Sequence, residues 1–426
     1  STRKESSAAS DVYKRQGHKS IIEHDYLVFA ICDVTPIIEQ TIIGNRLTSF
    51  TIKSRREVDF RTAGFYIPEF RNKDLNTHPK NEELKQKYIS HMKYLFNTYG
   101  DLVDNGIDVE DARFILPYSF HSNIIMGLNA RELEKMVTSF LYGPLSKISE
   151  LKEFGEKLLS IIKEFVPYLE KSIESYSNYS NNPFDYMESL ANRPKIKIVS
   201  KPVLISNTPN PDDVIIKSSI MYHFQCSEQE AKQIMEESES MNIILHKEER
   251  RELEQVSFTF QIPISLSILT HLTRHRMHSL LIPEFTPLWD FNNFIIPATI
   301  QAKSELKNIF INAQKENMKI FEEFKNSNVS DEDLIYFYLG CQMLNVVTTM
   351  NGRTLQWILH LRCCNKAQWQ IRNIAKELAK QVSSVAPLLG KGLGPTCMTD
   401  LVCYEGKECC GLINSLLENR TVEKIK

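Results

Sequence analysis

Hydrophobic and polar residues follow two different periods along this chain. Residues 258–262, Phe-Thr-Phe-Gln-Ile, alternate as a half-buried strand does, and helical spacing follows at Ile264, Ile268, Leu269 and Leu272. The runs 196–200 and 203–206 are β-branched or alternating and predict two more strands, with a turn and a helix start at 209–213. The pattern therefore predicts short strands interleaved with helices.

A later segment predicts a long helix with one apolar side. That side consists of Ile371, Ile374, Ala375, Leu378, Ala379 and Val382. We interpret it as core, and we expect Trp357 and Trp369 to pack in the interior as well.

The two halves of the chain resemble each other. Four residue pairs, offset by 231, 230, 222 and 220 positions, are Phe29 with Phe260, Arg46 with Arg276, Asn129 with Asn351 and Pro167 with Pro387. Between the halves lies the polar stretch 172–183, rich in residues that compete with regular structure. We expect tandem domains at 17–171 and 195–390, a linker at 172–194 and a cysteine-containing tail at 391–426.

The first residues are set aside. Residues 11–16, Asp-Val-Tyr-Lys-Arg-Gln, resemble the translation of a transposase adapter used in sequencing libraries, so we expect residues 1–16 to be non-native. The first repeat is then truncated at its start, because only the second repeat has the strands and helix start at 196–213.

Composition limits the classes of partner. With 51 basic against 53 acidic residues in 426, and a formal net charge of -2, the chain has no overall field for nucleic acid or an anionic membrane. No window approaches the roughly 18 apolar residues of a membrane span. Nine cysteines without small-domain spacing fit a reducing compartment. We expect a soluble, cytoplasmic protein.

The tail cysteines leave two interpretations open. Cys397, Cys403, Cys409 and Cys410 could bind zinc, but their spacing is not that of ordinary zinc knuckles. Reduced thiols in a terminal loop are the interpretation that we favour, and we expect no metal.

The run Arg274-His275-Arg276-Met277-His278-Ser279 crowds cationic side chains, and a damaged copy of it lies at 44–49. Crowded cations are stabilised by an anion, and guanidinium groups bind phosphate in a bidentate manner. Two plainer interpretations are a solvated basic turn and a set of cations capping the preceding helix.

The run and its surroundings resemble the flavin-dependent thymidylate synthases, whose signature is R-H-R-x-x-S-x-N-x-x-S-x-R-Y. The second half keeps Arg274, His275, Arg276 and Ser279 but has Glu284 and Thr286 where the later Ser and Arg belong. The first half lacks the first Arg and the His, yet keeps Arg46, Ser49, Ser54 and Arg56. Residues 17–24 also resemble the family's G-H-x-S-x-x-E-H.

A second block of the family pattern is divided in the same way. Residues 112–117 resemble A-R-x-x-L-P and supply Arg113, which has no counterpart near Ile335. Residues 367–371 resemble A-Q-x-E-I, with Gln370 for the acid, and follow Arg362, which Phe140 replaces in the first half. Each half therefore lacks groups that the other keeps.

The resemblance implies an α+β fold of two tandem domains, each an antiparallel sheet packed with helices. It implies reductive methylation of dUMP to dTMP, with methylenetetrahydrofolate as carbon donor, FAD as cofactor and NADPH or NADH as reductant. Family members are homotetramers, so two of these chains would form a homodimer of four repeats. The alternatives are a degenerate member that binds FAD or nucleotide without turnover, and a flavin-free protein that kept only the fold.

The resemblance also implies roles for single residues. It places Arg362, Arg274 and His275 in catalysis. It assigns dUMP to Ser54, Arg56, Arg113 and Arg362. It assigns FAD to His18, Ser20, Glu23, Arg274, His275, Arg276, Asn129, Arg131, Asn351 and Arg353. The family has a flavin-contacting Asn at the position of Trp357, which is the alternative to core packing there.

Overall fold

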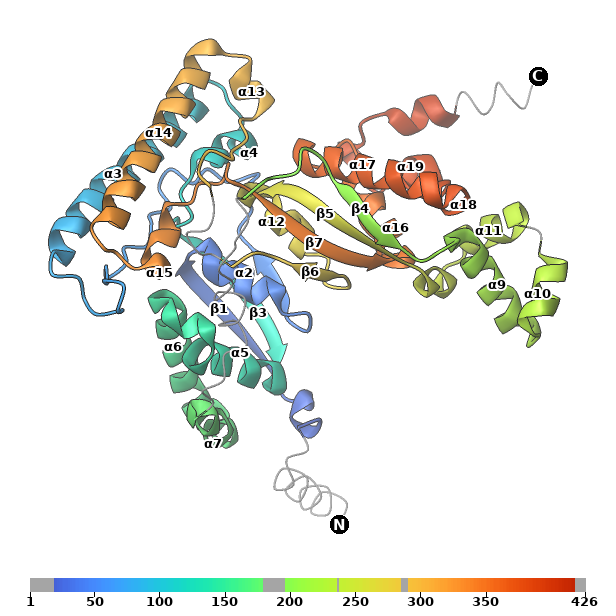
Figure 1. The fold of residues 1–426 in the computed structure, drawn as a ribbon, viewed down its shortest axis with the longest axis horizontal. Helices are drawn as coiled ribbons and strands as arrows, with labels where there is room; N and C mark the ends of the chain where they lie inside the picture. Colours follow the sequence, from blue (N-terminus) through green and yellow to red (C-terminus); the bar gives the residue numbers. More distant parts are fainter. Residues whose placement is uncertain (1–18, 179–195, 236, 285–289, 418–426) are drawn as a thin grey trace. The chain divides into compact units, whose positions relative to one another are not determined.

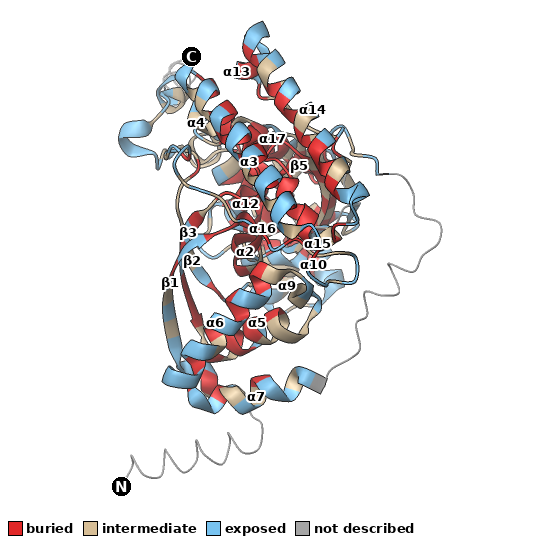
Figure 2. Cartoon of the chain, turned by 90° about the vertical axis from the view of Figure 1, so that its left-hand side faces the viewer, coloured by how far each residue is buried: buried red, intermediate tan, exposed pale blue. Residues whose placement is uncertain are grey.

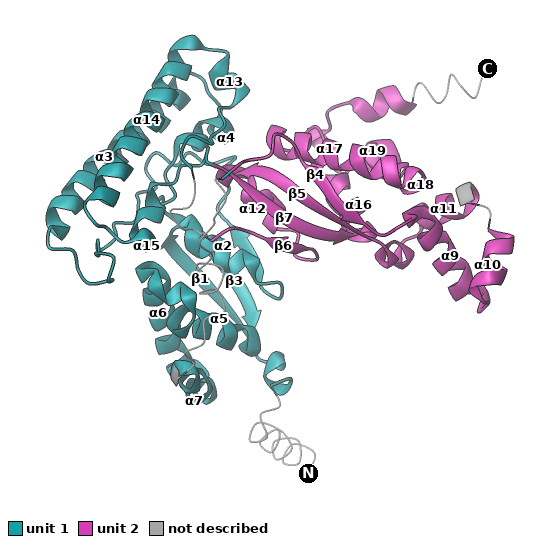
Figure 3. Cartoon of the chain, viewed as in Figure 1, with its two compact units in different colours: residues 1–196, 285–342 teal, residues 197–284, 343–426 magenta. Residues whose placement is uncertain are grey.

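The computed structural model of the protein describes residues 19–178, 196–235, 237–284 and 290–417. The chain forms two compact units (Figure 3). Unit 1 comprises residues 1–196 and 285–342, and unit 2 comprises 197–284 and 343–426. Residues 285–342 therefore belong to the second repeat by sequence and to the first unit by packing.

Unit 1 contains a three-stranded antiparallel sheet in the order β1-β3-β2, of which Figure 1 labels β1 and β3. Its strands are β1 (Tyr26–Val34), β2 (Ser49–Ile52) and β3 (Ser122–Asn129). The helices that follow the strands are α2 (Pro36–Gly44), α5 (Ala130–Tyr142), α6 (Ser149–Phe165) and α7 (Glu170–Glu174). Side chains alternate along β3, where Ile124 and Met126 are buried and Ile125 between them is 53% exposed. The sheet therefore has one covered and one open face.

Unit 2 repeats this plan with an additional strand, in the order β4-β5-β7-β6. Its strands are β4 (Val203–Asn207), β5 (Ser257–Ser265), β6 (Ser279–Leu281) and β7 (Met343–Asn351). The helices that correspond to those of unit 1 are α12 (Leu266–Thr273), α16 (Gly352–Arg362) and α17 (Trp369–Val385). The remaining helices are α9 (Pro211–Phe224), α10 (Glu228–Ile234), α11 (Glu237–His246), α18 (Pro387–Gly390) and α19 (Thr396–Thr399).

The duplication is visible in the strand register. Tyr26 of β1 pairs with Asn129, and Ser257 of β5 pairs with Asn351, so each first strand begins opposite the Asn that ends the third. The α+β fold of two tandem domains, each an antiparallel sheet packed with helices, is confirmed.

The helical segments of both repeats pack together within unit 1. Helices α3 (Asn81–Asp104) and α14 (Ser304–Asn326) lie side by side, and their buried faces are red in Figure 2. Beyond them, Pro117 forms an antiparallel bridge with Leu339, and the Tyr118 amide donates to the Tyr338 carbonyl at 2.7 Å. Pro117 and Leu339 are 222 positions apart, as are Asn129 and Asn351, so the bridge joins equivalent residues. It marks a local pseudo-twofold axis, the geometry of an isologous contact.

An aromatic core joins α3 and α14. The ring of Tyr88 on α3 lies 5.4 Å from those of Phe70 and Phe337, and Phe324 of α14 lies 5.0 Å from Phe337. Edge-on rings at such separations add to the stabilisation from buried area. The two repeats therefore share one hydrophobic core here.

Most local predictions from the pattern agree with the structure. Three do not, and the third of them concerns Trp357. The strand at 203–206, the helix start near Pro211 and the apolar side of α17 are present. The described residues 196–200 form no strand, and Ile264 belongs to β5 rather than to the helix after it.

Trp357 does not pack in the interior of its unit. It lies on α16 and is 62% exposed, whereas Leu355, Ile358 and Leu359 form the buried side of that helix. A residue two positions from Leu355 points to the opposite side of an α-helix, so the prediction of core packing was wrong. Trp369, the first residue of α17, is half-buried.

Candidate functional site

In unit 1, cationic residues that follow the end of β2 lie close to the start of the 3-10 helix η2 (Arg113–Ile115). The Ser54 hydroxyl accepts a hydrogen bond from the Arg56 amide at 3.3 Å, and the Arg56 side chain pairs with Glu110. Arg113 is only 4% exposed, and its Nε donates to the Glu110 carbonyl at 3.0 Å. The structure thus places Ser54, Arg56 and Arg113, three predicted phosphate ligands, around one acid.

Arg113 is electrostatically under-compensated. Within the described part of the chain its buried Nη2 atom has no hydrogen-bond partner. Burial, together with repulsion from Arg55, lowers the pKa of Arg113 to about 9. A buried donor without an acceptor destabilises a protein by about 1–3 kcal/mol, and an anion that reached Nη2 would remove that cost.

Arg55 is a residue of this cluster that sequence reasoning missed. Its Nη2 atom pairs with Glu39 of α2 at 2.8 Å, and both side chains are buried. It occupies the variable position of the S-x-R element, so the family pattern gave no reason to select it. Its neighbour Glu39 was the available signal, because a charged residue within the apolar stretch of α2 needs a partner.

Unit 2 joins two predicted catalytic residues. Arg274 is the C-cap of α12, His275 follows it, and Arg362 is the last residue of α16. Arg362 Nε donates to His275 Nε2 at 3.0 Å. Burial, and then the charges of Arg362, His278 and Arg274, lower the pKa of His275 to about 3. The imidazole is therefore neutral at physiological pH and accepts through Nε2, which fixes its proton on Nδ1.

His278 is a buried histidine that we had not assigned a role. Its Nδ1 lies 2.6 Å from the Thr348 hydroxyl of β7, and its Nε2 lies 3.3 Å from the Leu272 carbonyl of α12. These contacts tie the residues before β6 to the helix and to the neighbouring strand. They hold the backbone that follows Arg276.

The two Asn-x-Arg motifs have the same structure. Asn129 caps α5 by accepting from the Glu132 amide at 2.9 Å, and Asn351 caps α16 by accepting from the Thr354 amide at 2.8 Å. Arg131 pairs with Glu23, and Arg353 pairs with Glu254 at 2.6 Å. Glu254 is the counterpart of Glu23, offset by 231, and we had missed it.

The remaining predicted flavin ligands are near these motifs or beyond the described residues. Ser20 is exposed and precedes the 3-10 helix η1 (Ile21–His24) that carries Glu23. His18 lies outside the described residues. Arg276 is half-buried at the start of the turn leading to β6.

The acid of the A-Q-x-E-I element survives in the first repeat as Glu150. Its carboxyl accepts from the Thr35 amide at 3.0 Å, the Thr35 hydroxyl at 2.7 Å and the Tyr336 hydroxyl at 3.0 Å. Gln370, 220 positions later, accepts from the Ser265 hydroxyl at 2.5 Å. Burial raises the pKa of Glu150 to about 7. Each residue fixes the start of the helix after the first strand, α2 or α12.

The described residues contain no group of three or more His, Cys, Asp or Glu side chains placed to hold a metal ion. Among the helices that the structure describes, none has the length and apolar character of a membrane span.

Comparison with known proteins gives the family. The sequence profile described as thymidylate synthase complementing protein matches residues 1–168 and 203–388. The chain belongs to the flavin-dependent thymidylate synthase family. The first match begins at residue 1, within the segment that the adapter resemblance led us to set aside.

Individual members of the flavin-dependent thymidylate synthase family align with half of the chain. The Clostridium tetani enzyme is 33% identical over 230 residues, covering 49% of this chain and 92% of that protein. The Geobacter sulfurreducens enzyme is 28% identical over 218 residues, with 50% and 94% covered. A structural comparison with the UMP/dUMP methylase PolB from Streptomyces cacaoi gives 14% identity and a TM-score of 0.39, covering 46% of this chain and 96% of PolB.

Proposed function

We propose that the chain is an active flavin-dependent thymidylate synthase whose sites take groups from both repeats. It would methylate dUMP to dTMP with methylenetetrahydrofolate, FAD and NADPH. The hydrogen bond from Arg362 to neutral His275 is the observation that carries this proposal, because a chain that had lost catalysis would have no need to orient this guanidinium.

Arg362 and His275 have separable tasks. Arg362 would stabilise the negative charge that develops on uracil as C5 becomes nucleophilic. The neutral His275 acceptor leaves the guanidinium fully charged and fixes its direction, and preorganised donors are more effective than mobile ones. Arg274 and Arg276 beside them would add positive potential for the flavin.

The cluster in unit 1 would hold the nucleotide phosphate. Ser54 offers a hydroxyl, Arg56 a guanidinium, and Arg113 the buried Nη2 atom that lacks a partner among the described residues. The second repeat has Ile335 at the Arg113 position, and the first has Phe140 at the Arg362 position. A complete set of groups therefore requires contributions from both repeats.

The Asn-x-Arg motifs fit a flavin dinucleotide. Each places an arginine in the first turn of a helix, where backbone amides and the dipole favour a diphosphate. Arg131 Nε is buried and lacks a hydrogen-bond partner among the described residues. Asn129, Arg131, Asn351, Arg353, Ser20 and Glu23, with His18, would hold FAD. When bound, FAD supplies the hydride transfer.

The open face of the unit 1 sheet supports a dimer. Tyr26, Val28 and Ile125 are exposed by 57%, 67% and 53%, and the register places them on one face. Large apolar side chains clustered on a sheet surface favour association. Two chains paired in this way would carry four repeats, the number found in the family's homotetramers.

Release of tritium from dUMP labelled at C5 tests the proposal. Turnover that depends on FAD, methylenetetrahydrofolate and NADPH is expected. The alternative is a degenerate member that binds FAD or nucleotide without turnover, and the incomplete signature in each repeat favours it. Bound flavin and nucleotide without tritium release would select this alternative.

A further inference from the structure

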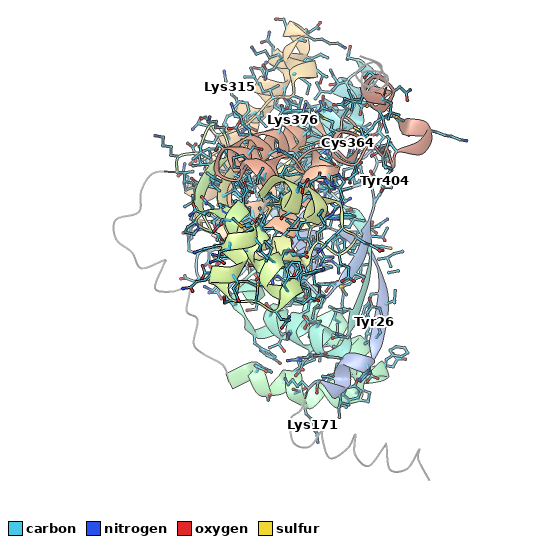
Figure 4. All side chains as sticks on the ribbon, turned by 90° about the vertical axis from the view of Figure 1, so that its right-hand side faces the viewer. Tyr26, Lys171, Lys315, Cys364, Lys376 and Tyr404 are labelled. Carbon is cyan, nitrogen blue, oxygen red and sulfur yellow. The ribbon has the colours of Figure 1, made fainter. Side chains whose placement is uncertain are left out.

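Six of the nine cysteines line one cavity of about 390 Å³ in unit 2. They are Cys363, Cys364, Cys397, Cys403, Cys409 and Cys410. Figure 4 labels Cys364, Lys376 and Tyr404 of this lining. Two separate parts of the chain meet here, namely the connection between α16 and α17 and the segment after α18. The cavity therefore joins the tail to the loop that follows Arg362.

Two of the six thiols, those of Cys403 and Cys409, interact through their side chains. The Cys403 thiol is hydrogen-bonded to Cys409 and accepts from the Glu405 amide. Cys409 in turn accepts from the Gly411 amide at 3.5 Å. Cys363 differs, since burial raises its pKa to about 12 and buried thiols of this kind are unreactive. Cys403 and Cys409 are both partly exposed, so a small reagent can reach them.

The segment 403–410 also holds the loop that begins after Arg362. Three side-chain contacts join segment and loop: Cys364 to Glu405 at 3.8 Å, Lys366 to Glu408 at 2.8 Å, and Asn365 to Cys410 at 3.6 Å. Two of these contacts use acids that lie between Cys403 and Cys409 in sequence. A constraint on this short stretch is therefore a constraint on the loop.

We propose that Cys403 and Cys409 form a reversible dithiol–disulfide pair whose oxidant is a low-molecular-weight disulfide such as glutathione disulfide. The thiolate of one cysteine attacks the glutathione disulfide, forms a mixed disulfide and releases one glutathione thiolate. The second cysteine then attacks the protein sulfur of that mixed disulfide and releases the other. Two electrons pass from the pair to the oxidant, and the two thiol protons end on the two glutathione molecules.

The place of the two cysteines in the fold favours this step. A disulfide needs its sulfur atoms at about 2.05 Å, and Cys403 and Cys409 line the same cavity and interact through their side chains. The new bond would close a ring that contains Glu405 and Glu408 and would hold both acids against Cys364 and Lys366. An effect on Arg362 rests on the proposed function, whereas the disulfide itself does not.

Mass spectrometry of the full chain tests the pair. The reduced protein is equilibrated with glutathione disulfide, free thiols are blocked, and trypsin is used without reductant. Cleavage after Lys391, Lys407 and Arg420 places Cys397 and Cys403 in one peptide and Cys409 and Cys410 in the next. We expect these two peptides to be linked, and the link to disappear on reduction.

Four single variants identify the sulfur atoms. Cys403→Ser and Cys409→Ser should each abolish the link, whereas Cys397→Ser and Cys410→Ser, altered in the same peptides, should retain it. A link that survives in Cys403→Ser or Cys409→Ser would overturn the pair. A stable mixed disulfide with glutathione would also overturn it, as would a stoichiometric metal ion whose removal is needed before the thiols react.

Hydrogen exchange in the loop is the second measurement. Amide exchange at residues 363–366 should slow on oxidation of the wild type and stay unchanged in Cys403→Ser. Equal exchange in the reduced and oxidised wild type would overturn the proposed link to the loop. If the disulfide forms but the protein does not methylate dUMP, only the proposed function is refuted. If the protein methylates dUMP but forms no disulfide, only the Cys403–Cys409 pair is refuted.

Discussion

The Glu150 carboxyl accepts a hydrogen bond from the Thr35 hydroxyl at 2.7 Å, and the second repeat makes the same contact with Gln370 and Ser265. An amide therefore performs in one repeat what an acid performs in the other. Both residues act on the start of a helix, α2 or α12, so the shared task is to orient that helix.

Glu150→Gln should remove a pH dependence of stability. Burial raises the pKa of Glu150 from 4.5 to about 7, so the folded state binds its proton more tightly than the unfolded state does. Stability from this group is full below about pH 4.5 and is lost as pH rises to about 7. At pH 8 the variant should be more stable than wild type by up to about 3 kcal/mol.

Denaturant unfolding at several pH values measures this difference. Glu156→Gln, an exposed change on the same helix, should leave the wild-type pH profile unaltered. An unchanged slope between pH 5 and pH 7 in Glu150→Gln would show that this carboxyl is ionised in the folded protein.

Arg56→Ala and Arg362→Ala should each abolish methylation, although they lie in different repeats. Loss of either charge-assisted contact should cost about 2–4 kcal/mol of transition-state stabilisation, or about 30- to 1000-fold in rate. Arg46→Ala and Ser279→Ala should matter much less, since the first repeat lacks the first Arg and the His of the signature and the second repeat lacks its later Ser and Arg. Full activity in either of the first two variants would refute that residue's assignment.

Mixing Arg56→Ala with Arg362→Ala tests which chains supply one site. If both groups of a site come from one chain, every site in a mixed dimer is damaged and activity stays low. If they come from different chains, a mixed dimer has one intact site and activity partly returns. Tritium release from the mixture distinguishes the two arrangements.

His275→Ala should lower kcat/KM by about 10- to 100-fold, because Arg362 loses the acceptor that orients it. The wild-type profile of kcat/KM against pH should have no limb near 6.5 from this imidazole, since burial and Arg362 lower its pKa to about 3. His246→Ala, at an exposed position, is the control. A limb near pH 6.5 that disappears in His275→Ala would contradict a neutral, orienting role.

The purified protein should carry FAD, or take it up when FAD is added. The paired Asn-x-Arg motifs and the arginines around His275 supply the cations that a dinucleotide requires. A flavin absorbance spectrum of the protein after gel filtration is the measurement. Arg131→Ala and Arg353→Ala should each weaken uptake, and a well-folded protein that takes up no FAD would rule out flavin binding.

The protein should be a homodimer, with the open sheet face of unit 1 in the interface. Light scattering should give twice the chain mass, and Val28→Asp should shift the protein toward monomer because it places a charge among exposed apolar side chains. Ser160→Asp, at an exposed position on α6 rather than on the sheet, is the matched substitution and should leave the mass unchanged. A fully active monomer would remove the dimer from the mechanism.

Sequence reasoning recovered what local patterns and motif spacing encode. The strand 258–262, the helix end at Arg274 and the equivalence of Asn129 with Asn351 are properties of short segments, and the structure contains them. Trp357 was misjudged because apolar character does not say which side of α16 faces the core. Glu150 was missed because the residues around it no longer match the family element.

The assignment of residues 285–342 to unit 1 could not be read from the sequence. It depends on contacts between equivalent residues more than 200 positions apart, such as Pro117 with Leu339. A repeat boundary follows from similarity between segments of the sequence. A compact unit follows from which surfaces bury each other, and here residues 285–342 of the second repeat are buried against the first repeat.

The bridge between Pro117 and Leu339 changes what a single mutation does. In an assembly of identical subunits, one codon determines both sides of a twofold axis, so every substitution there occurs twice. Here two codons face each other, and a change at residue 117 leaves residue 339 as it was. The two sides of the axis can therefore diverge independently. This chain can place different residues on the two sides, which identical subunits cannot do.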